Sequence, residues 1–414
     1  MGQGTQPSGD AGHGSHRRGI LISFSFLLAI AVVVIAAQVL RPVLQEPSAS
    51  VPPPSTAVPS TLPTFRPGAP LDRIRSVSLD FDIVDNLHTD WQGVDARLDQ
   101  VGATTVNLNA GRVEFTAFDW PAHPDAAAVP GVDHLAVAAN ALHLNADGSD
   151  REINLILDTY VPEWIKEDPS LAGVDARGRR STYTASAAQI LEGEVGQRLR
   201  DYAVALADRY HPNQIEVTEL FLNVFSFGAD DLALYQRMTG AKDWPRSKGG
   251  EINTDAPALG TWRSEVLRDF MAKMRTAVDA VEGGSQIELA LDVRVSWRDP
   301  AGGRPESGHD YAILLESGIR LQLWTYFGRA GQPPEQIRSV TAALKDAGFD
   351  MTRFIISVGL WKGDTQVENL DSISAAELGV AVGEAATNGI IDVNVTPYSL
   401  MTDAHWASLE TAWG

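Results

Sequence analysis

Eight short apolar segments, separated by helix-like stretches, recur from residue 73 to the C-terminus of this 414-residue chain. Continuous apolar runs are typical of parallel strands buried on both faces, and regular alternation with helical periodicity is typical of βα units. The pattern predicts an α/β fold, a (β/α)8 TIM barrel, at 71–414. A doubly wound open sheet is the competing fold, but it usually carries a glycine-rich phosphate turn after its first strand, which this sequence lacks. The predicted strands are 77–84, 104–109, 153–157, 215–220, 287–293, 321–325, 354–359 and 391–395.

Helices are expected between these strands, and the longest are predicted at 187–210 and 262–281. A long insertion at 223–260 follows the fourth strand and should lie on the functional face of the barrel, where the strand C-terminal ends open. It contains Trp244, which we expect to be exposed and to contact a ligand.

The N-terminal part of the chain predicts a membrane protein. Residues 19–40 are uncharged and about long enough to cross a hydrocarbon core as one helix. Two arginines precede this stretch and one follows closely, so the positive-inside bias places 1–18 in the cytoplasm as a disordered tail. The Pro-, Ser- and Thr-rich residues 41–70 predict an extended linker. The expected location is the cell membrane, single-pass, with the C-terminal domain extracytoplasmic; a cleaved signal peptide is the alternative.

Charge and motifs exclude several function classes. The formal net charge of −20 repels phosphate backbones, so nucleic acid is not an expected partner. Cysteine is absent, which excludes disulfides, a thiol nucleophile and Cys-ligated metal. The histidines show no metal-ligand spacing, and neither a P-loop nor a Gly-x-Ser-x-Gly elbow is present, so we expect no metal and no cofactor.

Carboxylates, amides and aromatic residues gather at the predicted strand ends. Aromatic rings stack on sugar rings, amides and Arg bind hydroxyls, and paired carboxylates perform acid/base or nucleophilic chemistry, so the mixture favours a carbohydrate ligand. The candidate binding residues are Asp82, Asn109, Arg112, Glu114, Asp158, Asn223, Arg294, Trp297, Trp324, Tyr326, Trp361, Asn394 and Tyr398, with Trp164 beside Asp158 after the third strand.

Three carboxylates are the catalytic candidates. Glu219 ends the fourth predicted strand, where a carboxylate after an apolar run indicates a catalytic or structural role. Asp292 ends the adjacent fifth strand. Asp80 shares one face of the first predicted strand with Asp82 by the two-residue period. The alternative for Glu219 and Asp292 is a structural ion pair, for instance with Arg294. Trp324 and Tyr326 alternate onto one face of the sixth strand, where they form a stacking platform or pack in the barrel core.

Several short segments resemble the family-10-like glycosyl hydrolases, a group of exported bacterial barrels. They are Val-Gly-Ala-Thr-Thr-Val-Asn at 101–107, Pro-Gly-Val-Asp-His-Leu-Ala at 130–136, Tyr-His-Pro-Asn-Gln-Ile-Glu at 210–216, and Trp-Arg at 262–263. The resemblance spans roughly 75–300. Where the family carries Asp-Asp-Tyr at the end of the fourth strand, this chain has Thr218-Glu219-Leu220, so Glu219 stands in for one acid and the second is missing.

The expected function is that of a membrane-anchored extracytoplasmic glycoside hydrolase-like protein that cleaves a polysaccharide or oligosaccharide by carboxylate acid/base catalysis. The main alternative is a non-catalytic carbohydrate-binding barrel, a surface receptor or envelope scaffold. The seventh predicted strand favours this alternative, because it is followed by Leu360 and Trp361 with no carboxylate before Asp364. A carboxylate-based lyase or transferase is a third interpretation.

Overall fold

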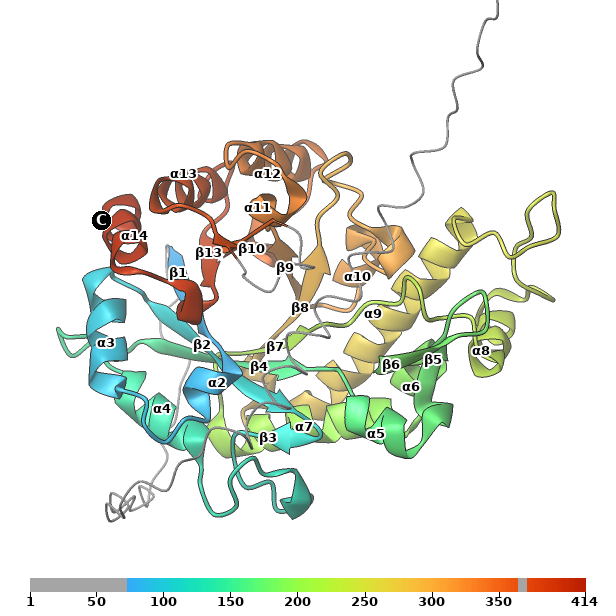
Figure 1. Ribbon diagram of the computed structural model, residues 1–414, viewed down its shortest axis with the longest axis horizontal. Coiled ribbons are helices and arrows are strands. Elements are labelled where there is room, and N and C mark those ends of the chain that lie inside the picture. The colour runs from blue at the N-terminus through green and yellow to red at the C-terminus, as the bar shows by residue number, and fades with distance from the viewer. Residues whose placement is uncertain (1–72, 364–370) are drawn as a thin grey trace, which may run out of the picture. The chain divides into compact units, whose positions relative to one another are not determined.

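Eight parallel strands close into a barrel in the computed structural model, which describes residues 73–363 and 371–414 (Figure 1). The strand order is β1-β13-β10-β9-β8-β7-β4-β2, and β2 pairs back onto β1, with Val77 beside both Val106 and Val395. The (β/α)8 barrel prediction is therefore confirmed. The barrel strands are β1 (Ile74–Leu79), β2 (Thr105–Arg112), β4 (Glu152–Asp158), β7 (Gln214–Thr218), β8 (Glu288–Arg294), β9 (Arg320–Trp324), β10 (Phe354–Gly359) and β13 (Asp392–Thr396).

One main helix follows each barrel strand, and Figure 1 shows these helices around the outside of the barrel. They are α3 (Trp91–Gln100), α4 (His134–Leu142), α7 (Glu194–Tyr210), α9 (Pro257–Asp279), α10 (Tyr311–Leu315), α12 (Gln336–Asp346), α13 (Ala375–Ala385) and α14 (Asp403–Trp413). In α7, Val195, Leu199, Tyr202 and Leu206 recur at helical spacing and are fully buried against the barrel.

Shorter elements decorate the loops. They are α2 (Phe81–Val84), α5 (Pro162–Glu167), α6 (Ala187–Leu191), α8 (Ala229–Thr239), α11 (Phe327–Ala330), β3 (Phe115–Thr116), β5 (Ala172–Val174), β6 (Arg180–Ala185), β11 (Trp361–Lys362) and β12 (Asp371–Ser372). The strand β3 pairs antiparallel with the end of β2, and the hairpin β5–β6 lies beside α5 and α6.

The helix predicted at 187–210 and the first predicted strand differ from the structure. The helix predicted at 187–210 is broken between α6 and α7, because the backbone of Gly193 is extended. The two helices pack so closely there that a Cβ at Gly196 would collide with the carbonyl of Ile190. The first strand ends at Leu79 and not at 84, since Asp80 is the N-cap residue of α2. The prediction that Asp80 and Asp82 share a strand face is therefore wrong.

The barrel interior is unusually polar for parallel strands, which are commonly apolar on both faces. The side-chain amide oxygen of Asn394 accepts hydrogen bonds from Ser76 and Ser78 at 3.2 and 3.0 Å, and its amide nitrogen donates to Ser357 at 3.0 Å. At the amino ends of the strands, Arg320 pairs with Asp392 at 2.8 Å. These bonds join β1, β10 and β13 across the barrel interior and help to fix the strand register, at a desolvation cost that the apolar layer between barrel and helices offsets.

No helix of residues 73–363 and 371–414 is long and apolar enough to cross a membrane. The predicted span at 19–40, the tail at 1–18 and the linker at 41–70 lie outside the described residues.

Candidate functional site

Glu219 lies at the carboxyl end of β7 in a conformation that is rare for its residue type. Its φ angle is +59°, in the left-handed region that disfavours residues with a Cβ. The Tyr160 hydroxyl donates a hydrogen bond of 2.6 Å to Glu219 Oε2, and Tyr160 is itself 4% exposed. Strained residues of this kind cluster at functional sites, so the turn points to a role for the side chain that it orients.

Burial and the neighbouring charges favour the protonated form of Glu219. Burial raises the pKa of Glu219 to about 7; the charges of Asp158 and Asp292 raise it further, while Tyr160 and Arg294 oppose the shift. Burial also raises the pKa of Asp158, which ends β4, whereas Arg112 lowers it. The ends of β4, β7 and β8 thus bring three carboxylates into one electrostatic unit, and a carboxyl group that titrates near neutrality can donate or accept a proton.

Glu216 is a second buried carboxyl group, and Gln322 links it to Asp292. Gln322 Nε2 donates to Glu216 Oε1 at 2.6 Å and to Asp292 Oδ1 at 2.9 Å, so one amide holds both carboxyl groups. Burial and the charge of Asp292 raise the pKa of Glu216 well above its usual range. Burial raises the pKa of Asp292 only to about 6, because hydrogen bonds to its carboxylate oppose the shift. Glu216 is therefore the protonated member of the pair at neutral pH, and Asp292 is the ionised one.

His309 joins the ends of β7 and β8. The backbone N–H of Arg294 donates to His309 Nδ1 at 3.0 Å, so Nε2 carries the proton and donates to the carbonyl of Leu220 at 2.9 Å. Burial lowers the pKa of His309 to about 3, which keeps the ring neutral. This bridge fixes the backbone on which Glu219 and Arg294 are mounted, and the Arg294 guanidinium lies 3.7 Å from the ring centre of Phe221.

Three half-buried aromatic rings lie beside the ends of β9 and β10. The rings of Trp324 and Tyr326 stack on each other at 5.4 Å with an interplanar angle of 12°, and Tyr326 lies 5.0 Å from Trp361. Gly359 makes room for this cluster, because a Cβ there would collide with the Tyr326 ring. The three rings form a partly exposed apolar surface at the barrel mouth.

The remaining sequence-predicted residues lie in the barrel interior and in the segments that follow its strands. Asn394 is fully buried inside the barrel, Tyr398 packs on Trp406 at 5.5 Å, and Asn109 accepts a bond from the backbone of Gly111 at 2.9 Å. Asp80 accepts a bond of 3.0 Å from the backbone N–H of Ser399. Asp82 is exposed on α2, and Asn223 and Trp297 are half-buried in the loops after β7 and β8.

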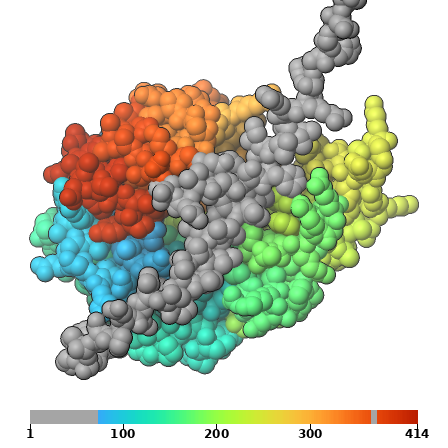
Figure 2. Space-filling model, viewed as in Figure 1, coloured from blue at the N-terminus to red at the C-terminus, as the bar shows by residue number. Residues whose placement is uncertain are grey.

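Trp244 overturns one expectation. The residue is 5% exposed and packs on Phe227, Tyr235 and Trp262, with ring centres 5.4, 4.9 and 5.6 Å away. It anchors the insertion to α9 and is not an exposed ligand contact. Figure 2 shows that the yellow part of the insertion projects at the edge of the molecule.

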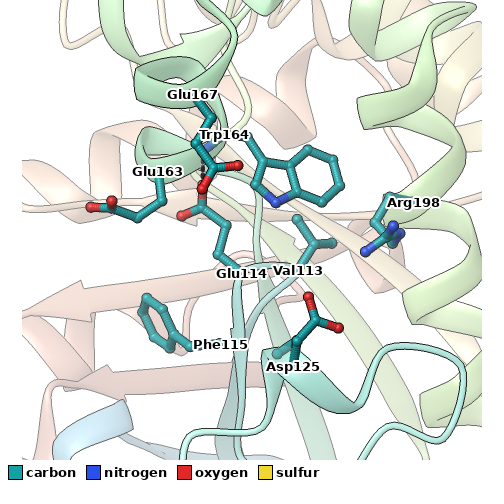
Figure 3. A pocket seen from close by; sticks show the side chains of 9 residues that line it. Val113, Glu114, Phe115, Asp125, Glu163, Trp164, Glu167 and Arg198 are labelled. Atoms are coloured by element: carbon teal, nitrogen blue, oxygen red, sulfur yellow. Dashed lines mark hydrogen bonds between the residues drawn. The ribbon is translucent and has the colours of Figure 1, made fainter.

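A pocket of about 380 Å³ lies between the end of β2, α5 and α7 (Figure 3), and we call it the β2–α5 pocket. Arg112, which precedes the pocket residue Val113, is the register partner of Asp158 at the ends of β2 and β4. The pocket is lined by Val113, Glu114, Phe115, Asp125, Ala126, Glu163, Trp164, Glu167 and Arg198.

Sequence reasoning missed Tyr160, Glu216, His309 and Gln322. Glu216 carried a usable signal, since it alternates with Gln214 and Thr218 on one face of a strand that is otherwise apolar. The other three could not be found, because their roles depend on neighbours distant in the chain. Among residues 73–363 and 371–414, no group of three or more His, Asp or Glu side chains could hold a metal ion.

Comparisons with known proteins identify the fold. No family model matches the chain, and no curated protein matches its sequence. An α-L-fucosidase isoenzyme 2 from Paenibacillus thiaminolyticus is similar in structure with a TM-score of 0.57 and 14% identity, over 82% of this chain and 49% of that one. The catalytic domain of a β-amylase from Paenibacillus polymyxa gives a TM-score of 0.55 and 10% identity, over 82% and 98% of the two chains.

These identities establish fold similarity alone, and the chain spans about half the length of the fucosidase. The resemblance to family-10-like glycosyl hydrolases has no matching family model behind it. By its strand order and by these neighbours, the chain is a (β/α)8 barrel.

Proposed function

We propose that this protein is a glycoside hydrolase in which Glu219 is the general acid/base and Asp292 the second carboxylate. The observation that carries the proposal is the setting of Glu219. It is held at the carboxyl end of β7 by a left-handed turn and by Tyr160, and burial together with two neighbouring carboxylates raises its pKa to about 7. The active sites of this fold lie on that face. The two similar structures are named as a fucosidase and an amylase, which supports a glycosidic substrate.

The chemistry follows from the two environments. Glu219 keeps a large protonated fraction near pH 7 and can therefore donate a proton to the oxygen of the departing sugar. Asp292 stays ionised because Glu216 takes the shared proton, and it acts as nucleophile or as base toward water. A carboxyl separation of about 5 Å leads to retention of configuration and about 6.5–9.5 Å to inversion. The rings of Trp324, Tyr326 and Trp361 supply a surface on which a sugar ring stacks.

The proposal uses Asp292 in preference to Asp80, because Asp292 raises the pKa of Glu219 directly whereas Asp80 is bound to the backbone of Ser399. A non-catalytic carbohydrate-binding barrel is the second candidate. It is favoured by the end of β10, where the described residues 359–363 include no carboxylate. The predicted span at 19–40 supports an anchored protein with the barrel outside the cell.

The test is release of reducing sugar from purified cell-envelope polysaccharides by the full chain in detergent, with binding to the same polymers recorded. Glu219→Gln should abolish release and keep binding. Glu282→Gln is the matched control, since Glu282 is exposed between α9 and β8, at the opposite ends of the strands. Binding without release by the parent protein would instead support the carbohydrate-binding barrel, and unchanged release by Glu219→Gln would refute the role of Glu219.

A further inference from the structure

The β2–α5 pocket carries a charge imbalance. Its lining residues include four carboxylates, those of Glu114, Asp125, Glu163 and Glu167, and one cation, Arg198. The Arg198 guanidinium lies 4.8 Å from the ring centre of Trp164, and Lys166 pairs with Glu163 at 3.0 Å. Among the described residues, Asp125 and Glu167 make no ion pair. The pocket lining therefore holds more acidic than basic side chains, and Arg112 and Lys166 offset the charges of Glu114 and Glu163.

Glu114 is the deepest of these carboxylates, and its bonding is incomplete. Its side chain is 3% exposed, and Oε1 accepts the backbone N–H of Trp164 at 2.8 Å (Figure 3). Oε2 has no hydrogen-bond partner, although it forms an ion pair with Arg112 Nε at 3.5 Å. Burial raises the pKa of Glu114 to about 7, although the bond from Trp164 and the charge of Arg112 oppose the shift. A cationic donor placed in the pocket would give Oε2 a partner and favour the ionised form.

The pocket also offers donors and an aromatic surface. Figure 3 shows the Trp164 indole beside Val113, Asp125 and Arg198, so that an N–H group and a guanidinium line the same space as the carboxylates. Hydroxyl groups both donate and accept, and this mixed lining fits a polyol better than a simple cation. A volume of about 380 Å³ lies within the range of small-ligand sites.

A short stretch of sequence joins the residue that bonds Glu219 to the helix that lines the pocket. Tyr160, whose hydroxyl bonds Glu219, precedes α5 by two residues, and α5 supplies Glu163, Trp164 and Glu167 to the pocket. We propose that the β2–α5 pocket is a subsite for a sugar unit that carries a protonated amine, an unacetylated amino sugar, next to the cleavage centre. This inference rests on the proposed function, and it names the substrate class of the same site.

The test is calorimetric titration of the full chain in detergent with a β-1,4-linked glucosamine tetramer and with its N-acetylated counterpart. The pH is about 7, below the ordinary pKa of an amine and close to the raised pKa of Glu114, so that both charged forms are populated. The unacetylated tetramer should bind at least about ten-fold more tightly, as expected for a charge-assisted hydrogen bond. Glu114→Gln, which keeps the Oε1 acceptor, and Glu167→Gln should each remove most of this preference. Glu282→Gln removes one negative charge outside the pocket and should keep the preference. It therefore tests whether the preference arises only from the protein's net charge of −20.

Melting temperatures establish that each variant is folded, and the exposed position of Glu167 allows that variant to test the subsite even if Glu114→Gln unfolds. Equal binding of the two tetramers, or an equal loss in Glu282→Gln, would overturn the inference. So would tetralysine competing as well as the amino sugar, which would make the pocket a site for basic peptides. Amino-sugar binding without hydrolysis would support the subsite and contradict the hydrolase proposal. Hydrolysis of neutral polysaccharides without amino-sugar binding would support the hydrolase proposal and contradict the subsite.

Discussion

Replacing Tyr160 with Phe should raise the pKa of Glu219. The Tyr160 hydroxyl donates to Glu219 Oε2 at 2.6 Å, and this bond favours the ionised carboxylate. A hydrogen bond to a charged group contributes about 1.5–3 kcal/mol. Because one pKa unit equals 1.36 kcal/mol, its loss should raise the pKa from about 7 by about 1–2 units.

The measurement is an NMR titration of carboxyl-labelled glutamate in the full chain, with the Glu219 resonance assigned from the spectrum of Glu219→Gln. Tyr235→Phe is the control, since Tyr235 is a buried tyrosine that packs on Trp244 and Trp262, away from Glu219. An unchanged or lowered pKa in Tyr160→Phe would refute the account of this site.

The same shift has a consequence for stability. The pKa of Glu219 is raised from 4.5 to about 7, so the folded protein binds a proton more tightly than the unfolded chain does. Stability from this group is present below pH 4.5 and falls by about 3 kcal/mol as pH rises to about 7. Denaturant unfolding of Glu219→Gln should therefore show a smaller loss of stability over this interval than the parent, and an identical pH dependence would contradict the shift.

Two further substitutions test the packing that positions the site. Gly359→Ala should displace the Tyr326 ring and cost about 1–3 kcal/mol in thermal unfolding, whereas Gly383→Ala, in the helix α13 with open space around its Cα, should be neutral or stabilising. Arg151→Ala should cost about 3–5 kcal/mol in denaturant unfolding, because the buried guanidinium pairs with Asp95 at 2.7 Å and Asp99 at 2.5 Å. Arg237→Ala, which breaks an exposed pair with Glu192, should cost less than about 1 kcal/mol, and equal losses for the two arginines would refute the burial argument.

The order of elements was predictable because it depends on local pattern. Apolar runs such as 354–359 identify buried strands, and eight of them alternating with helices, without a glycine-rich phosphate turn after the first, favour a barrel over an open sheet. The same reasoning placed Glu219 and Asp292 at the carboxyl ends of adjacent strands, where the structure has them.

What only the tertiary structure decided is the environment of each side chain. Trp244 looks like an exposed loop residue in the sequence, but α9 supplies the Trp262 ring that buries it. The pKa of Glu219 is raised by desolvation and neighbouring carboxylates and is held back by the bond from Tyr160, 59 residues away in the chain, and all of these act only when the barrel closes. Sequence periodicity determines which segments become strands, because backbone geometry is local. The protonation and partners of a buried group depend on contacts and desolvation that exist only in the closed barrel.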